Sequence, residues 1–280
     1  MRTDDAPEKP SPAPPWWGNV VFAEDAARYV RVGPFELWIE RRLGEWTIHL
    51  RTGTDPRDGA LEIDRDVADP GVPPIPTSGT QVHNLALAPE ANALTLRPRL
   101  ADRAVVFSPS RTLIVPARGR ATLFATSPLW LELATAQSGR LFEAPLWRAS
   151  DTWFGDTNDG ELCYASRLHA TREPAELLRL PHRAVTPLEI ANGSDEPLLV
   201  ERISVPLRSL TLFRDQEGQL WTESVRLEHD RGAGLADVTR SGAAPLQAHG
   251  AEKVADPRDM HGLRFTARVF RGLFGGDDAR

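Results

Sequence analysis

The stretch FELWIERRLGEWTIHLR, residues 35–51, alternates apolar and polar side chains on both sides of a short Arg-Leu-Gly segment. The apolar residues that share a face are Phe35, Leu37 and Ile39 in the first half and Trp46, Ile48 and Leu50 in the second half. Alternation with a period of two is typical of a β-strand that buries one face. Two such runs around a glycine-containing turn predict a β-hairpin.

The same pattern extends along the chain as short apolar runs about ten residues apart, separated by prolines or turn dipeptides. We expect strands at 80–87, 92–97, 103–107, 111–115, 120–126, 129–135, 139–143, 161–166, 184–191, 198–205, 210–214, 219–227 and 234–239. Pro98, Pro109, Pro116 and Pro128 lie between strand candidates, where a residue without an amide hydrogen interrupts no ladder. Regular short strands with turns between them are typical of sandwiches and barrels.

Residues that interrupt helices are abundant, since 24 of the 280 residues are proline and 21 are glycine. This composition excludes a coiled coil, a helical bundle, a polytopic membrane protein and a collagen-like chain. The hydrophobic content of 41% is sufficient for a substantial core. We therefore predict an all-β protein with two packed antiparallel β-sandwich-like domains and a short C-terminal helix. A single larger bilayered β fold is the alternative.

The expected organisation follows the changes in composition along the chain. It comprises a disordered proline-rich N-terminus (1–15), a first β domain (16–144), a second, immunoglobulin-like β domain (145–240), a Gly/Ala/Pro-rich linker (241–257) and a basic amphipathic helix (258–274). A further helix of two turns is expected at 174–180, because PAELLRL begins with proline, which is favoured in the first turn of a helix.

The C-terminal segment 258–274 carries four arginines and one aspartate, a net charge of +3 in a chain whose net charge is −6. Arginines combined with phenylalanines at helical spacing are typical of a helix that lies on an anionic membrane or docks on a partner. The residues expected to make this contact are Arg264, Phe265, Arg268, Phe270, Arg271 and Phe274. The alternative is a helix that folds back onto its own β domain.

Charge and cysteine content limit the partners and the compartment. The 33 basic and 39 acidic residues argue against nucleic-acid binding. The single cysteine, Cys163, fits a reducing compartment. The N-terminal residues lack the apolar segment of a secretion signal, and no run approaches the ~20 apolar residues of a spanning helix. We expect a cytoplasmic protein with peripheral contact at the inner membrane.

The densest polar patch is DTWFGDTNDGE, residues 151–161. Its candidate site residues are Trp153, Asp156, Asp159 and Glu161. Clustered carboxylates are able to hold a hard cation or to carry out acid–base chemistry. The spacing does not fit an EF-hand loop, however, because the sixth position counted from Asp156 is glutamate instead of glycine. We favour a tight hairpin turn with solvated acids, and we expect no metal and no cofactor.

No catalytic motif is recognisable in the chain. Cys163 is a candidate nucleophile with His169 or His182, but it lies in the apolar run Leu-Cys-Tyr-Ala, which favours a buried, unreactive thiol. The seven histidines show no metal-binding spacing, and the glycine-rich phosphate loops and the Gly-x-Ser-x-Gly motif are absent from the sequence. We therefore expect a protein that is not an enzyme.

The eight tryptophans permit two interpretations. By alternation, Trp38 and Trp130 fall on strand faces shared with glutamate, where exposed rings would stack on sugars or anchor a partner. The other interpretation is a second buried face, since a sheet packed between two layers is apolar on both sides.

Two blocks resemble a known family. They are WFGDTNDGELCYA (153–165) and the Pro-Leu-x-Ile-x-Asn stretch (187–192), and they are similar to blocks of the domain-of-unknown-function family 432 of archaea and proteobacteria. The resemblance covers most of residues 19–240. That family has no established activity, so the resemblance implies no catalytic residues. Because some members neighbour small-conductance mechanosensitive channels, it implies a partner or regulatory role near such a channel.

The sequence thus favours a non-catalytic cytosolic β-sandwich module that acts in protein interaction or regulation, as an accessory protein of a membrane channel. The first alternative is a β module that binds a carbohydrate or another small ligand through exposed tryptophans. The second alternative is a hydrolase that uses the carboxylates of residues 151–161.

Overall fold

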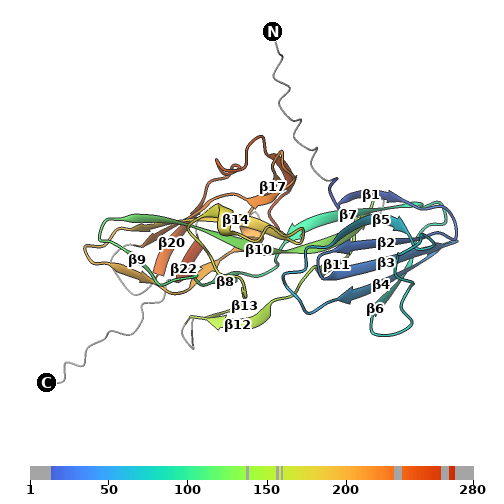
Figure 1. Cartoon of the computed structure of the whole chain (residues 1–280), viewed down its shortest axis with the longest axis horizontal. Helices are drawn as coiled ribbons and strands as arrows, with labels where there is room; N and C mark the ends of the chain where they lie inside the picture. The colour runs from blue at the N-terminus through green and yellow to red at the C-terminus, as the bar shows by residue number, and fades with distance from the viewer. Residues whose placement is uncertain are drawn as a thin grey trace, which may run out of the picture.

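The computed structural model describes residues 14–136, 139–155, 158, 160–229, 235–259 and 265–268. Within these ranges the chain is built from β-strands, and the helical elements are two short 3-10 turns, η1 (Pro174–Glu176) and η2 (Leu207–Ser209). The predicted all-β class is therefore confirmed. Figure 1 shows an elongated molecule with strands at both ends.

A five-stranded antiparallel sheet forms one end of the molecule (Figure 1). Its strands, in spatial order, are β5 (Leu61–Asp66), β2 (Ala27–Val32), β3 (Phe35–Arg42), β4 (Glu45–Thr52) and β6 (Gln81–Ala86). The predicted hairpin is confirmed as β3 and β4, which pair from Phe35 opposite Thr52 to Arg42 opposite Glu45. Gly44 in the turn has a φ of 72°, a conformation that glycine adopts without steric cost.

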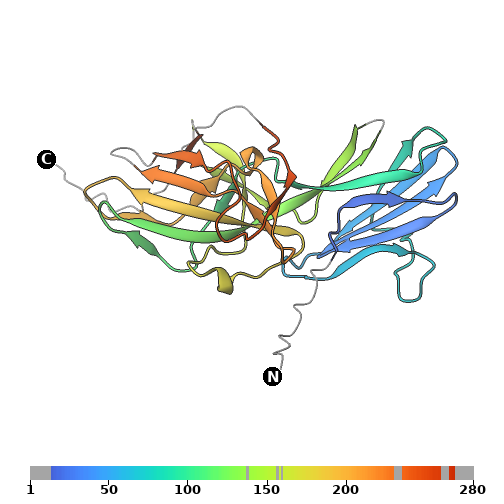
Figure 2. The same ribbon diagram turned by 90° about the horizontal axis from the view of Figure 1, so that it is seen from above.

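An eleven-stranded sheet extends along the molecule, from β1 (Gly18–Val21), β7 (Ala93–Leu100) and β11 (Gly139–Pro145) beside the five-stranded sheet to the opposite end (Figure 1, Figure 2). Its main path is β1, β7, β10 (Arg120–Thr135), β14 (Arg183–Asn192), β18 (Leu220–Thr222), β17 (Leu212–Arg214) and β21 (Glu252–Ala255). The strands off this path are β11, β19 (Val225–His229), β20 (Leu235–Arg240) and β22 (Phe265–Arg268).

Strand β10 connects the two ends of the molecule. Its first part, Arg120–Pro128, pairs with β14, and from Leu129 onward it pairs with β7 and β11. We expected Pro128 to separate two strands, but one strand of 16 residues runs through it. The proline is tolerated there because β10 changes its pairing partner at that point.

Two smaller sheets complete the fold. The first contains β12 (Ser150–Phe154), β13 (Glu161–Ala165), β8 (Val105–Phe107) and β16 (Ile203–Val205), and the second pairs β15 (Leu198–Val200) with β9 (Leu113–Val115). Strands on either side of residue 145 thus pair with one another, as β8 does with β13 and β10 with β14. The two predicted domains share sheets, and the boundary between them stays a prediction.

The largest cluster of buried apolar side chains draws on all the large sheets. It includes Leu37 and Ile48 from the five-stranded sheet, Leu96 and Leu131 from the eleven-stranded sheet, and Ile203 from the four-stranded sheet. A shared core of this kind fixes how the sheets lie on one another, since each apolar face is removed from water only by its neighbour.

The predicted C-terminal helix at 258–274 is not seen. Residues Phe265–Arg268 form strand β22, which pairs antiparallel with β20 from Leu235 opposite Arg268 to Val238 opposite Phe265. The free edge of β20 offers backbone hydrogen bonds, and such tertiary pairing overrides a local helical pattern. Residues 260–264 and 269–274 lie outside the described part of the chain. Within the predicted linker 241–257, strand β21 pairs with β17.

The predicted helix at 174–180 is also shorter than expected. Only the single turn of η1 forms, and Leu177 after it is extended, with a ψ of 133°. None of the residues of η1 is buried, so packing does not stabilise this turn as the start of a longer helix. In the described residues no helix has the length and apolar character needed to cross a membrane.

Candidate functional site

The patch predicted at 151–161 lies on the hairpin of β12 and β13. Trp153 stands directly opposite Leu162 across this hairpin, and both side chains are about half exposed, at 51% and 47%. The carboxylate of Glu161 accepts a hydrogen bond of 3.1 Å from the hydroxyl of Ser204. Asp156 and Asp159 lie outside the described residues.

The carboxylates of this patch that the structure describes are engaged by other side chains. Asp151 forms ion pairs with Arg148 at 3.1 Å and with Arg103 at 3.3 Å. Across the described ranges, no group of three histidine, cysteine or acidic side chains is arranged to hold a metal ion. The cation and hydrolase interpretations therefore gain no support from the part of the patch that is visible.

Cys163 is a buried thiol in β13. Its sulfur contacts the Glu161 carbonyl oxygen at 3.7 Å and the Ser204 hydroxyl at 3.8 Å. Burial, together with the charge of Glu161, raises the pKa of this thiol to about 12. A protonated thiol is a poor nucleophile, which agrees with the unreactive cysteine that the apolar run favours.

The tryptophans face inward with one clear exception. Trp16, Trp38, Trp46, Trp130, Trp147 and Trp221 are each at most 5% exposed, Trp17 is half-buried, and Trp153 is exposed. The indole of Trp38 donates to the Pro73 carbonyl at 3.0 Å, so the polar atom of the ring is satisfied inside the protein. The second, structural interpretation therefore holds for Trp38 and Trp130, and no strip of tryptophan rings is open for stacking on a sugar.

The residues predicted for docking are only partly visible. Phe265 and Arg268 lie on β22, while Arg264, Phe270, Arg271 and Phe274 lie outside the described residues. Because β22 is a strand, Phe265 and Arg268 do not belong to the helix that the sequence predicts there. Their part in membrane or partner contact stays a prediction.

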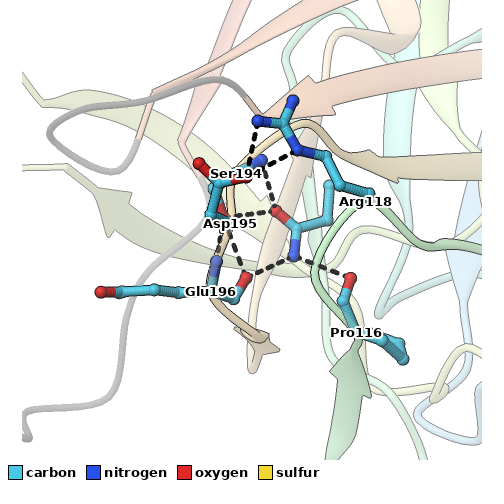
Figure 3. Close-up of polar contacts among 6 residues, drawn as sticks. Pro116, Arg118, Ser194, Asp195 and Glu196 are labelled. Carbon is cyan, nitrogen blue, oxygen red and sulfur yellow. Dashed lines mark hydrogen bonds and ion pairs between the residues drawn. The ribbon is translucent and has the colours of Figure 1, made fainter.

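Asn192, at the end of the stretch 187–192 that resembles the known family, has a structural role. The side-chain amide of Asn192, which is 2% exposed, donates to the carbonyls of Val115, Pro116 and Glu196 at 2.7–3.1 Å. Its oxygen accepts from the backbone and the hydroxyl of Ser194. Figure 3 shows the contacts to Pro116, Ser194 and Glu196 beside the Arg118–Asp195 ion pair, which joins the same two loops at 2.7 Å. The side chain of Asn192 thus holds the two loops together.

A large cavity lies where the five-stranded sheet meets the end of β11 and the segment after it. It has a volume of about 690 Å³, within the range of small-molecule sites. We call it the arginine cleft, and it is lined by Phe35, Leu50, Arg51, Thr52, Gly53, Thr54, Gly79, Thr80, Gln81, Ala144, Pro145, Trp147, Arg148 and Arg167.

Arg51, from β4, is held in place on one side of the cleft. Its Nε donates to the carboxylate of Glu36 at 2.6 Å, and its guanidinium lies 5.2 Å from the ring centroid of Trp38. Glu36 also accepts a hydrogen bond of 3.0 Å from the hydroxyl of Tyr29. Burial and the hydrogen bond to Glu36 raise the pKa of Tyr29, so this hydroxyl stays a donor. The side chain of Arg51 is 44% exposed and is therefore accessible from the cleft.

Trp147 and two arginines form the opposite side of the cleft. Arg167 lies 5.8 Å from the centroid of the Trp147 ring and is exposed. Arg148 is 56% exposed and lies beside Asp151. Behind the cleft, the buried Arg183 approaches the Trp147 ring to 5.3 Å. The ring thus lies near two guanidinium groups, an arrangement that cation–π attraction stabilises.

The lining of the arginine cleft offers binding groups instead of acid–base groups. Its charged members are three arginines, and its other polar side chains are three threonine hydroxyls and one glutamine amide. Arginine, threonine and glutamine do not titrate near neutral pH. Such a surface is able to hold an anion and to hydrogen-bond its hydroxyl or carbonyl groups.

The sequence predictions missed this site because its charges are dispersed. Arg51, Arg148 and Arg167 are far apart along the chain, and the sequence contains 31 arginines among which these three have no distinguishing neighbours. The sequence does hold one signal: its 31 arginines against two lysines favour a surface that pairs with carboxylates or phosphates.

The chain was compared with curated proteins and with solved structures, and no match was found in either comparison. A family described as "Protein of unknown function (DUF432)" matches residues 16–274. This range covers nearly the whole described chain and includes both the arginine cleft and the Asn192 turn. The chain therefore belongs to the DUF432 family of proteins of unknown function, as the blocks at 153–165 and 187–192 indicated.

Proposed function

We propose that this protein is a non-catalytic β module that binds an anionic small molecule in the arginine cleft. The observation that carries the proposal is the set of three arginines around a cavity of about 690 Å³ with no acidic residue in its described lining. Arg51 and Arg148 are partly neutralised by Glu36 and Asp151 behind them, whereas Arg167 contacts the Ser150 hydroxyl at 3.5 Å and no described carboxylate.

The cleft is also lined from separate parts of the chain. Arg51 and the threonines come from the five-stranded sheet and its loops, whereas Trp147, Arg148 and Arg167 come from the segments around β12 and β13. A ligand that contacts both sets would restrain one set relative to the other. This supports the regulatory role that the sequence favours, because binding would change the stability of the junction between the sheets.

Calorimetric titration of the full chain tests the proposal. The probes are inorganic phosphate, pyrophosphate and glucose 6-phosphate at low ionic strength. We expect at least one probe to bind, with an affinity that falls as salt is added, because guanidinium–phosphate attraction is screened. Arg167→Gln should weaken that binding at least tenfold, or by about 1.4 kcal/mol.

The matched control is Arg226→Gln. Arg226 is a partly exposed arginine on β19 that pairs with Glu228 at 2.8 Å and does not line the cleft. Its substitution should leave the affinity unchanged. Absence of binding by all three probes, or an Arg167→Gln variant as tight as the wild type, would contradict the proposal.

A second function, docking of a protein partner, is favoured by the exposed pair Trp153 and Leu162. Both are large apolar side chains on neighbouring strands, and exposed aromatic residues often anchor a partner. The membrane channel implied by the family resemblance is the partner we propose, with a cytoplasmic location at the inner membrane. Capture of partners from native membranes, followed by mass spectrometry, tests this proposal. The control variant is Leu178→Ser, because Leu178 is an exposed leucine outside the β12–β13 hairpin.

In that experiment Trp153→Ser with Leu162→Ser should lose the captured partner, and Leu178→Ser should retain it. If the double variant captures the same proteins as the wild type, the hairpin is not the docking surface.

A further inference from the structure

A second cavity lies where the N-terminal segment crosses the loop before β14 and the turn between β17 and β18. It has a volume of about 290 Å³ and shares no lining residue with the arginine cleft. We call it the Trp17 cavity, and it is lined by Pro14, Pro15, Trp16, Trp17, Leu61, Arg179, Leu180, Pro181, Arg183, Arg214, Glu217, Gly218, Gln219 and Leu220.

The wall formed by the N-terminal segment is fixed by Trp16. This side chain is 3% exposed, and its indole nitrogen donates to the carbonyl of Pro181 at 3.0 Å. Trp17 packs edge to face against Trp16, with ring centroids 5.4 Å apart. Together with Leu180 and Leu220, the two rings give the cavity an apolar wall that is already formed without a ligand.

The charged lining of the Trp17 cavity is mostly cationic, with three arginines and one glutamate. The guanidinium of Arg214 lies 5.8 Å from the centroid of the Trp17 ring. Arg179 and Glu217 form an ion pair at 3.4 Å, and with side chains 47% and 67% exposed they are free to exchange this contact for another.

Arg183 is the most unusual member of the lining. It is 1% exposed, and its Nη1 donates to the Thr126 carbonyl at 3.2 Å. Its Nε and Nη2 are buried and have no hydrogen-bond partner in the described part of the chain. Burial lowers the pKa of Arg183 to about 10, so the side chain is still charged at neutral pH. A buried cation with unsatisfied donors is costly, and a bound anion would relieve that cost.

We propose that the Trp17 cavity is a second binding site, specific for a small carboxylate with an apolar or aromatic body. The apolar body would lie against Trp17 and Leu220, and the carboxylate would be stabilised by the arginines that line the cavity. A planar carboxylate matches the fork of a guanidinium with two parallel hydrogen bonds. The small volume favours such a ligand over a sugar phosphate or a nucleotide.

Binding of indole-3-acetate, benzoate and acetate to the full chain tests this second site. The readouts are calorimetry and hydrogen exchange. We expect the two aromatic acids to bind at least tenfold more tightly than acetate. Bound acid should slow amide exchange at Trp16, Trp17 and residues 216–220, and it should leave exchange at residues 50–54 and 79–81 unchanged. The phosphate probes should instead slow exchange at residues 50–54 and 79–81. Failure of one binding site can therefore be told apart from failure of the other.

Three variants locate the contacts. Trp17→Ala should weaken indole-3-acetate binding at least tenfold, and Arg179→Gln should weaken it severalfold. Arg183→Met keeps the volume of the side chain and removes its charge, and it should also weaken binding at least tenfold while the chain stays folded. Arg226→Gln, remote from the cavity lining, is the control and should bind like the wild type.

Either of two results would overturn the proposal. The first is absence of binding by both aromatic acids in the wild type. The second is an unchanged affinity in both Trp17→Ala and Arg179→Gln, which are surface changes that the fold should tolerate even if Arg183→Met does not fold.

Discussion

The guanidinium of Arg183 lies 5.3 Å from the ring centroid of Trp147, and each residue lines a different cavity. Arg183 belongs to the wall of the Trp17 cavity, and Trp147 belongs to the wall of the arginine cleft. The stacked pair therefore joins the two candidate sites. Both side chains are at most 5% exposed, so a change in either would be transmitted through packed atoms instead of solvent.

Replacement of Trp147 tests this contact. Trp147→Ala should lower the free energy of unfolding by about 3–5 kcal/mol, because it opens a void and removes the ring beside the buried cation of Arg183. Trp147→Phe keeps a ring in place and should lower it by less than about 2 kcal/mol. Urea denaturation of the two variants checks both values. Equal losses in Ala and Phe would show that the ring does not stabilise Arg183.

Replacement of Asn192 should lower the free energy of unfolding more than replacement of most other polar residues. Asn192→Ala leaves the carbonyls of Val115, Pro116 and Glu196 without their donor, and we expect a loss of about 2–4 kcal/mol. Arg118→Gln breaks only an exposed ion pair between the same loops and should cost under about 1 kcal/mol (Figure 3). Denaturant midpoints of the two variants give the comparison. A similar, small loss in both would contradict the role given to Asn192.

His182 should make stability depend on pH. Burial is the main cause that lowers its pKa to about 4, and the charge of Arg183 acts in the same direction against that of Asp58. In the unfolded state His182 is protonated near pH 6.5, whereas in the folded state it stays neutral down to about pH 4. The contribution of the neutral side chain to the free energy of unfolding is therefore fully present above pH 6.5. It should fall by about 3 kcal/mol as the pH drops to about 4.

The measurement is the free energy of unfolding of the wild type and of His182→Gln between pH 7.5 and 4.5. The difference between the two should shrink as the pH falls, because the variant lacks the group that is protonated on unfolding. A difference that stays constant across this range would contradict the prediction. Carboxylates titrate in both proteins and cancel in the comparison.

Truncation after Asp256 should destabilise the protein. Arg258 donates through Nε to the Leu100 carbonyl at 2.6 Å and pairs through its other nitrogens with Glu143, and both side chains are at most 15% exposed. The truncation also removes β22 from the edge of β20. We expect the melting temperature to fall by about 5 °C or more.

Arg258→Met separates the two causes, because it removes the contact to Glu143 and keeps β22. This variant should show part of the fall in melting temperature that the truncation causes. If the truncated protein melts at the wild-type temperature and is released from membranes, the segment after Asp256 is a docking element independent of the fold.

The strand pattern was readable from the sequence because it depends on local alternation. The hairpin predicted at 35–51 is confirmed, since alternating apolar residues around a short turn favour a pairing that buries them together. The wrong helix prediction arose because only local spacing was considered. The helix predicted at 258–274 rested on spacing alone, and at Phe265–Arg268 the edge of β20 determined the outcome through long-range hydrogen bonds.

The candidate sites were much less accessible from the sequence. The acidic patch attracted attention because its residues are consecutive, whereas the arginine cleft gathers Arg51, Arg148 and Arg167 from distant segments. Even Trp17, which the sequence placed at the start of the folded part, gave no sign that Arg183 and Arg214 would lie beside it.

The sequence by itself determined the all-β class, the strand periodicity and the family, because these depend on neighbouring residues and on composition. Only the tertiary structure decided which tryptophans are buried, which arginines converge, and where the end of the chain pairs. Those outcomes depend on contacts between residues that lie far apart along the chain, such as Arg258 with Glu143 and Trp16 with Pro181. Local alternation cannot encode such contacts, because many different sheet arrangements bury the same strand faces.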